Sequence, residues 1–160
     1  HDAYVAGEGV LQASLLGAVP LADLRGTSEV AQGQLLRFLA EAPWYPTALL
    51  PSQGVRWEAV DDASARATLS DAGLSVSVVF YFSEAGYLEG MRAPSRARTV
   101  GRALVPTPWV GKFWNYEERG GMRVPLQGEV GWGLPQGERA YWRGRVTLLE
   151  YEWVAQPSVS

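Results

Sequence analysis

An alternation of apolar and polar side chains runs through residues 55–93, and it constrains the fold more than any other feature of the sequence. A period of two residues is typical of β-strands that bury one face. The separators DA, AG and EAG are short enough for tight turns between antiparallel strands. The pattern predicts four consecutive strands, over Val55–Asp61, Ser64–Asp71, Leu74–Ser83 and Tyr87–Ala93.

A helix is predicted before these strands. Thr27 or Ser28 can cap a helix over Glu29–Ala42, and Pro43 ends it. The expected core side carries Ala31, Leu35, Phe38, Leu39 and Ala42, with Leu36 at its margin. The expected outer side carries Gln34, Arg37 and Glu41. The prolines of the next segment, WYPTALLPSQGV, favour a short helical turn and a loop.

The two ends of the chain complete the predicted domain. One strand is expected over Ala3–Leu16, with a bulge at Gly7 or Gly9, and a connector over Pro20–Gly26. After the four strands we expect a basic loop that ends at Lys112. Strands are then predicted over Phe113–Glu118, Met122–Leu134 and Glu138–Trp153. The prediction is one α+β domain over residues 1–153, a mostly antiparallel, open half-barrel-like sheet with one main helix packed on it, and a flexible tail over 154–160.

The composition excludes several kinds of functional site. The chain has no cysteine, and His1 is its only histidine, so thiolate or imidazole metal sites and nucleophile–histidine pairs are not expected. No phosphate-binding glycine loop or metalloprotease motif is found, so we predict no cofactor and no metal. A net charge of −3 and the lack of a long apolar run argue against a nucleic-acid partner and a membrane span in this chain.

Positive charge is nevertheless concentrated in residues 90–116, which contain no acid. The segment carries Arg92, Arg96, Arg98, Arg102 and Lys112. Arginine can bind an anion through two parallel hydrogen bonds, or it can pair with the acids of the N-terminal half. Both interpretations remain open, and internal ion pairs are the commoner explanation of such a run.

Aromatic residues gather at the predicted helix exit and in the C-terminal part. Glu41 lies near Trp44 and Tyr45, and a carboxyl group among aromatic rings is suited to act as a general acid. In the run AYWRGR, strand alternation places Tyr141 and Arg143 on the face opposite Trp142.

Purely structural roles are also compatible with both patterns. Trp44 and Tyr45 can pack against the sheet as core residues, and Arg143 can form a cross-strand ion pair with Glu117 or Glu129. Glu129 is also a candidate second carboxylate for acid–base chemistry with Glu41, although spacing alone does not bring the two together.

The sequence resembles an uncharacterised bacterial family, one of the domains of unknown function. The resemblance is carried by WYPTALLPSQGVRWEAVDDASARATL, GRALVPTPWVGKFWNY, GMRVPLQGEVGW and AYWRGRVTLLEYEW, and it extends over nearly all of residues 2–153. It implies that this chain is the C-terminal part of a longer protein, and it implies no activity. The architecture is also similar, more weakly, to the bacterial lipoprotein carrier and receptor fold, in which an open half-barrel wraps around a helix.

The leading hypothesis is a noncatalytic binding domain for an apolar or amphipathic small molecule or lipid. The expected pocket residues are Glu41, Trp44, Tyr45, Trp57, Tyr116, Trp132 and Trp142, with Arg96, Arg98 and Arg143 at the rim. One alternative is a hydrolase or isomerase with Glu41 as general acid or base and Tyr45 or an arginine as electrophile. Another is a structural or assembly domain whose sheet edge takes a partner or the N-terminal remainder of the same protein.

Overall fold

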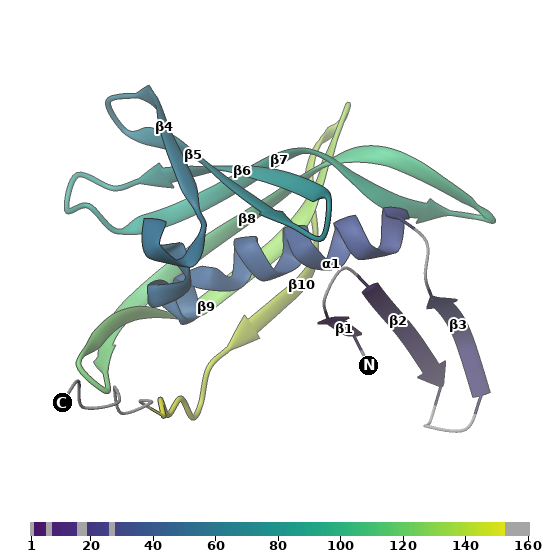
Figure 1. The fold of residues 1–160 in the computed structure, drawn as a ribbon, viewed down its shortest axis with the longest axis horizontal. Coiled ribbons are helices and arrows are strands. Elements are labelled where there is room, and N and C mark those ends of the chain that lie inside the picture. Colours follow the sequence, from purple (N-terminus) through teal and green to yellow (C-terminus); the bar gives the residue numbers. More distant parts are fainter. Residues whose placement is uncertain (1, 6–7, 16–18, 26–27, 153–160) are drawn as a thin grey trace, which may run out of the picture.

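The computed structural model describes residues 2–5, 8–15, 19–25 and 28–152 (Figure 1). The first strands form a three-stranded antiparallel sheet, β1 (Asp2–Val5), β2 (Glu8–Leu15) and β3 (Val19–Arg25). The helix α1 (Ser28–Glu41) follows. After it come the short 3₁₀ helices η1 (Ala42–Trp44), η2 (Pro46–Leu49) and η3 (Pro51–Gln53).

The rest of the described chain is a seven-stranded antiparallel sheet in which every strand pairs with its neighbour in sequence. Its strands are β4 (Arg56–Asp61), β5 (Ser64–Asp71), β6 (Leu74–Phe82), β7 (Leu88–Val100), β8 (Ala103–Arg119), β9 (Met122–Leu134) and β10 (Gly137–Arg145). The strands predicted over residues 55–93 are all present as β4 to β7. The predicted α+β class, an open antiparallel sheet with one main helix on it, is confirmed.

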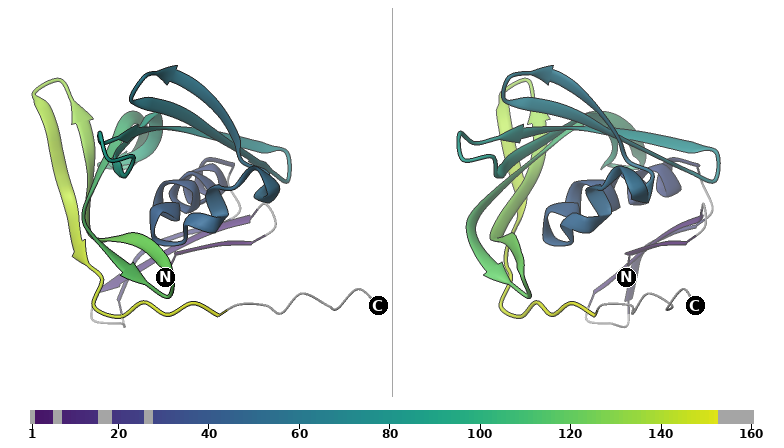
Figure 2. Two further views of the ribbon diagram at one scale, coloured as in Figure 1. Left: turned by 90° about the vertical axis from the view of Figure 1, so that its left-hand side faces the viewer. Right: turned by 60° about the vertical axis from the view of Figure 1, so that its left-hand side comes forward.

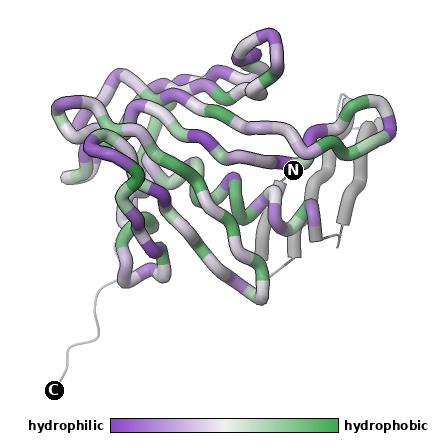
Figure 3. The backbone as a smooth tube through the Cα atoms, turned by 90° about the horizontal axis from the view of Figure 1, so that it is seen from above, coloured by the Kyte–Doolittle hydropathy of each residue, from purple (hydrophilic) through white to green (hydrophobic). Residues whose placement is uncertain are grey.

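The core lies where α1 packs into the concave face of the large sheet, which curves around the helix (Figure 2). Leu35 and Leu39 of the helix are 2% and 1% exposed, and Phe80 of β6 is fully buried. Figure 3 shows apolar and polar residues interspersed along the large sheet, and in β6 they alternate regularly, so that Val76, Val78 and Phe80 are buried on one face. Among the residues that the structure describes, no helix is long and apolar enough to cross a membrane.

The buried side of α1 is wider than predicted and differs at two positions. Gln34, expected outside, is only 7% exposed, whereas Phe38, expected in the core, is 45% exposed. The helix contacts β1 and β2 as well as β6 and β7, so strands of both sheets cover it. The single apolar face predicted from the sequence therefore includes too few of the buried positions of α1. Phe38 lies near the helix end and packs against the ring of Tyr45, with 5.5 Å between centroids.

The N-terminal prediction was wrong in two respects. The single strand expected over Ala3–Leu16 is divided into β1 and β2, and the connector expected over Pro20–Gly26 is largely β3. Pro20 argued against a strand, but β3 is an edge strand of its sheet, where a missing N–H group is tolerated. Gly7, Leu16, Gly26 and the proposed cap Thr27 lie outside the described residues, as do Trp153 and the tail.

The predicted basic loop is a long hairpin, because β7 continues to Val100 and β8 begins at Ala103. Its prolines favoured a loop, yet prolines are compatible with strands that lack a neighbour on one side. The last strand is shorter than predicted and ends at Arg145. Beyond it the chain leaves the sheet and returns to the helix exit, where the Tyr151 hydroxyl donates a hydrogen bond to the Trp44 carbonyl over 2.7 Å.

Candidate functional site

A cavity of about 420 Å³ opens between the C-terminal half of α1 and the concave face of β8, β9 and β10. Arg37, Ala40 and Glu41 of the helix form one side, and Trp44 follows them at the helix exit. The sheet contributes Arg96, Trp109, Val130, Tyr141 and Trp142. Figure 2 shows the large sheet curving around the helix that carries the first of these residues.

Trp44 is held at the base of the cavity by the chain that leaves the helix. Its indole N–H donates to the carbonyl oxygen of Pro125 over 2.8 Å. Its ring meets Phe113 and Trp142 edge to face, with centroids 5.5 and 6.4 Å apart, an arrangement favoured by aromatic quadrupoles. Gly128 of β9 makes room for it, because a Cβ atom there would lie 3.0 Å from Cζ2 of Trp44.

A β-bulge in β10 builds the opposite wall. The register with β9 shifts between Ala140 and Trp142, which leaves Tyr141 as the extra residue. Tyr141 and Trp142 therefore both line the cavity, although they are adjacent in sequence. The predicted alternation, which put them on opposite faces, was wrong here because it assumed a regular strand.

Tyr141 is also the centre of the polar wall. Its hydroxyl oxygen accepts a hydrogen bond from the Trp109 indole N–H over 2.9 Å and another from the Arg96 guanidinium over 3.3 Å. The guanidinium also lies over the Trp109 ring, 4.3 Å from its centroid. The predicted residue Trp132 stacks on Tyr141 at 5.3 Å, and Arg98 lies 5.9 Å above the Trp132 ring. The site thus places two arginines beside aromatic rings.

Glu41 lines the cavity as part of an ion pair. Its carboxylate accepts a hydrogen bond from the Arg37 guanidinium at 2.6 Å, one helical turn away, and both side chains are about one third exposed. The Tyr45 hydroxyl does not reach Glu41. It donates instead to the Phe38 carbonyl over 2.8 Å, and burial, followed by the charge of Glu41, raises the pKa of Tyr45 well above its ordinary value.

Two further predicted pocket residues lie elsewhere in the fold. The Trp57 indole donates to the Leu49 carbonyl over 2.9 Å and packs on Phe80 at 5.8 Å, so it is partly buried against the core near β4 to β6. The Tyr116 hydroxyl donates to the Leu88 carbonyl, and burial raises its pKa above the ordinary range. Neither side chain lines the cavity.

Arg143 lies on the convex face of the sheet. It pairs with Glu129 at 2.6 Å, so the cross-strand pairing considered from the sequence is confirmed. Glu129 also faces Lys112 at 3.9 Å, and these charges form a ladder across β8, β9 and β10. Strand alternation places Glu129 on the face opposite its neighbour Val130, a cavity residue, so Glu41 and Glu129 do not form a carboxylate pair.

The structure therefore brings together four of the predicted site residues, namely Glu41, Trp44, Arg96 and Trp142, with Trp132 and Arg98 beside them. Sequence reasoning missed Arg37, Ala40, Trp109, Val130 and Tyr141. For Trp109, the alternation of Val105, Thr107 and Trp109 was a usable signal that the intervening prolines obscured. No group of three acidic or histidine side chains that could hold a metal ion is found within the described ranges.

A search of curated proteins and a search of solved structures each found no significant match. A family model, by contrast, matches residues 1–151, which include the motifs that carried the resemblance. The expectation of an uncharacterised domain family is therefore confirmed, and the chain belongs to the Family of unknown function (DUF6920).

Proposed function

We propose that this chain is a noncatalytic binding domain that takes an amphipathic small molecule into the cavity between α1 and strands β8 to β10. The observation that carries the proposal is a cavity with aromatic walls and one cationic, hydrogen-bonding side. Its volume of about 420 Å³ lies within the usual range for small-molecule sites, roughly 300–1,000 Å³. An open half-barrel around a helix, as in lipoprotein carriers, is a suitable architecture for such a ligand by analogy.

The apolar part of the ligand would lie against Trp44, Val130 and Trp142. Burial of apolar surface contributes roughly 25 cal/mol per Å², so these side chains can supply most of the affinity. Trp142 is 46% exposed, and covering its indole ring with apolar surface is favourable. A ligand in the cavity would provide that cover.

The polar part of the ligand would face Arg96 and Tyr141. The Tyr141 oxygen accepts two hydrogen bonds from the protein. Its O–H group can therefore donate a hydrogen bond to an acceptor atom of the ligand. The Arg96 guanidinium lies beside this hydroxyl and carries only hydrogen-bond donors. An acceptor that carries negative charge, such as a carboxylate, fits this wall better than a cation does.

The proposal is tested by titration with the anionic dye 1-anilinonaphthalene-8-sulfonate, followed by displacement. Dodecanoate is expected to displace the dye at concentrations about tenfold lower than dodecyltrimethylammonium requires, because only the carboxylate suits the cationic wall. Trp142→Ala should weaken dye and dodecanoate binding about tenfold through loss of aromatic contact. Trp114→Ala, which removes a half-buried indole from the convex face, is the matched control and should change neither.

A second function is favoured by one observation, namely that Glu41 lines the cavity within hydrogen-bond distance of an arginine. In this alternative, Glu41 acts as general base or acid in a hydrolase or isomerase, with Arg37 as the electrophilic partner. The two functions are separated by incubating the protein with ligands that bind it and analysing them by mass spectrometry. Chemical change that Glu41→Gln abolishes without loss of binding supports the enzyme. Recovery of unchanged ligand supports the binding domain.

A further inference from the structure

Residues 94–108 form a two-stranded arm that leaves the seven-stranded sheet. β6 pairs with β7 only as far as Arg92, and β9 pairs with β8 only from Trp109. Between these points β7 and β8 are paired with each other, and within the described chain with no third strand. In Figure 1 the arm extends past the N-terminal end of α1, and its turn contains Gly101 in the left-handed region, at a φ of 61°.

The arm exposes aliphatic side chains that a two-stranded ribbon cannot bury. Val100, Leu104 and Val105 are 47%, 44% and 40% exposed. A two-stranded hairpin alone is only marginally stable in water. Exposed apolar side chains on both of its strands are typical of a surface that binds a partner with an apolar surface of its own.

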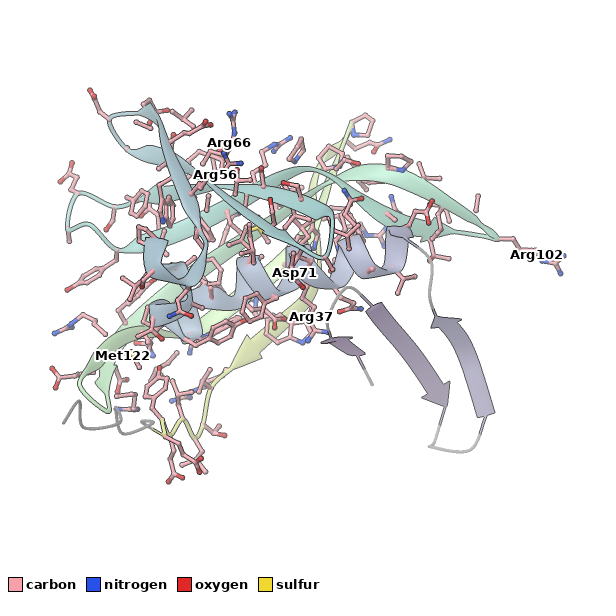
Figure 4. All side chains as sticks on the ribbon, in the orientation of Figure 1. Arg37, Arg56, Arg66, Asp71, Arg102 and Met122 are labelled. Atoms are coloured by element: carbon pink, nitrogen blue, oxygen red, sulfur yellow. The ribbon has the colours of Figure 1, made fainter. Side chains whose placement is uncertain are left out.

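All of the charged side chains in the same arm are positive. It carries Arg96, Arg98 and Arg102, and residues 90–116 contain no acid. Arg102 stands at the far end and points away from the rest of the molecule in Figure 4. The arm's own sequence contains no acid, and Arg102 at its tip is exposed, so the charge of this residue can face an external anionic surface.

We infer that this arm docks on an anionic lipid bilayer. The interface of such a bilayer accepts aliphatic side chains at the acyl boundary and guanidinium groups at the phosphates at the same time. A nucleic acid would accept the arginines and leave the three aliphatic side chains in water, so it matches only half of the surface.

The arm also leads toward the cavity. On β8, Val105, Thr107 and Trp109 follow one another at intervals of two residues, so Val105 lies on the face that continues to the cavity wall. A ligand taken from the bilayer would enter along this face. Docking itself is independent of the proposed ligand and is tested without one.

The test is flotation of the protein with vesicles of phosphatidylcholine alone or with 30% phosphatidylglycerol added, a composition chosen as the probe. Binding is expected to the anionic vesicles and to fall with added salt. Replacing Arg98 and Arg102 by Gln should weaken it about 25-fold, since each arginine near an anionic surface contributes about fivefold. Val100→Ser with Leu104→Ser should weaken it at least tenfold. Val60→Ser with Arg56→Gln, equally exposed positions on β4, should leave binding unchanged.

A second readout locates the contact and does not depend on affinity. Because the chain has no cysteine, Leu104→Cys and Val60→Cys each accept one environment-sensitive fluorophore. The label at position 104 should shift to the blue with anionic vesicles, and the label at position 60 should not. The inference is overturned by absent binding, by equal binding to neutral vesicles, by arm variants that bind normally, by a shift at position 60 alone, or by release from vesicles on addition of duplex DNA.

Discussion

Two glycines differ in how much room their surroundings leave for a side chain. Gly128 lies on the concave face of β9, where a Cβ atom would come within 3.0 Å of the Trp44 ring and 3.2 Å of the Lys112 carbonyl. Gly33 lies in the middle of α1, and the nearest described atom to a Cβ there is Nε of Arg96, at 3.9 Å. The same substitution therefore has opposite consequences at the two sites.

We expect Gly128→Ala to lower the free energy of unfolding by about 1–3 kcal/mol, because the added methyl group displaces Trp44. Gly33→Ala should raise it by about 0.5–1 kcal/mol through helix propensity. Urea denaturation followed by circular dichroism measures both values. Changes of the same sign at the two positions would contradict this account of the packing.

Two partly buried tyrosines make the free energy of unfolding depend on pH in the alkaline range. The hydroxyls of Tyr45 and Tyr116 donate to backbone carbonyls, and burial raises both pKa values above the ordinary 10.0. The fold favours their neutral form, so their contribution is complete below about pH 10 and is lost as the pH rises above that value. We expect the free energy of unfolding to fall between pH 9 and pH 11. The double variant Tyr45→Phe with Tyr116→Phe should lose less over this interval, and equal losses would contradict the expectation.

At the scale of elements, the hairpin of β7 and β8 has two parts that differ in the number of strands hydrogen-bonded to them. Residues 94–108 have one pairing partner within the described sheet, whereas β8 from Trp109 onward is paired on both sides. Backbone amides of the arm should exchange with solvent at least about tenfold faster than those of residues 109–113. Hydrogen–deuterium exchange with mass spectrometry resolves the two segments, and equal protection would show that the arm is supported in solution.

The elements that the sequence predicted well are those specified by local pattern. β4 to β6 follow from period-two alternation and two-residue turns, and α1 follows from its apolar spacing and Pro43. The arm was missed because its prolines and arginines are typical of loops. The wider buried side of α1 was missed because it depends on two sheets, which no local pattern reveals.

The site was predictable in part for the same reason. Trp44 and Glu41 lie together because they are close in sequence, and a surplus of tryptophan suggested that Trp142 would join them. Tyr141 was not predictable from alternation, since one extra residue in β10 changes the face to which it points. Trp57 is equally aromatic, but its position on β4 places it against another part of the core, away from the cavity.

At the scale of the whole molecule, the large sheet is open, and β4 and β10 are its edges within the described chain. An assembly role would use one of these edges. β4 carries charged side chains, Arg56, Glu58 and Asp61, which oppose edge-to-edge pairing. We therefore expect a monomer by size-exclusion chromatography with light scattering, and a concentration-dependent dimer would favour the assembly role.

Binding of a ligand in the space between α1 and strands β8 to β10 can be followed directly through the tryptophans that line it. The indole N–H signals of the seven tryptophans can be assigned in ¹⁵N-labelled protein by single substitution and followed during titration with dodecanoate. We expect the signals of Trp44, Trp109 and Trp142 to shift, while those of Trp57 and Trp114 stay unchanged. Unchanged signals, or shifts confined to Trp57 and Trp114, would contradict it.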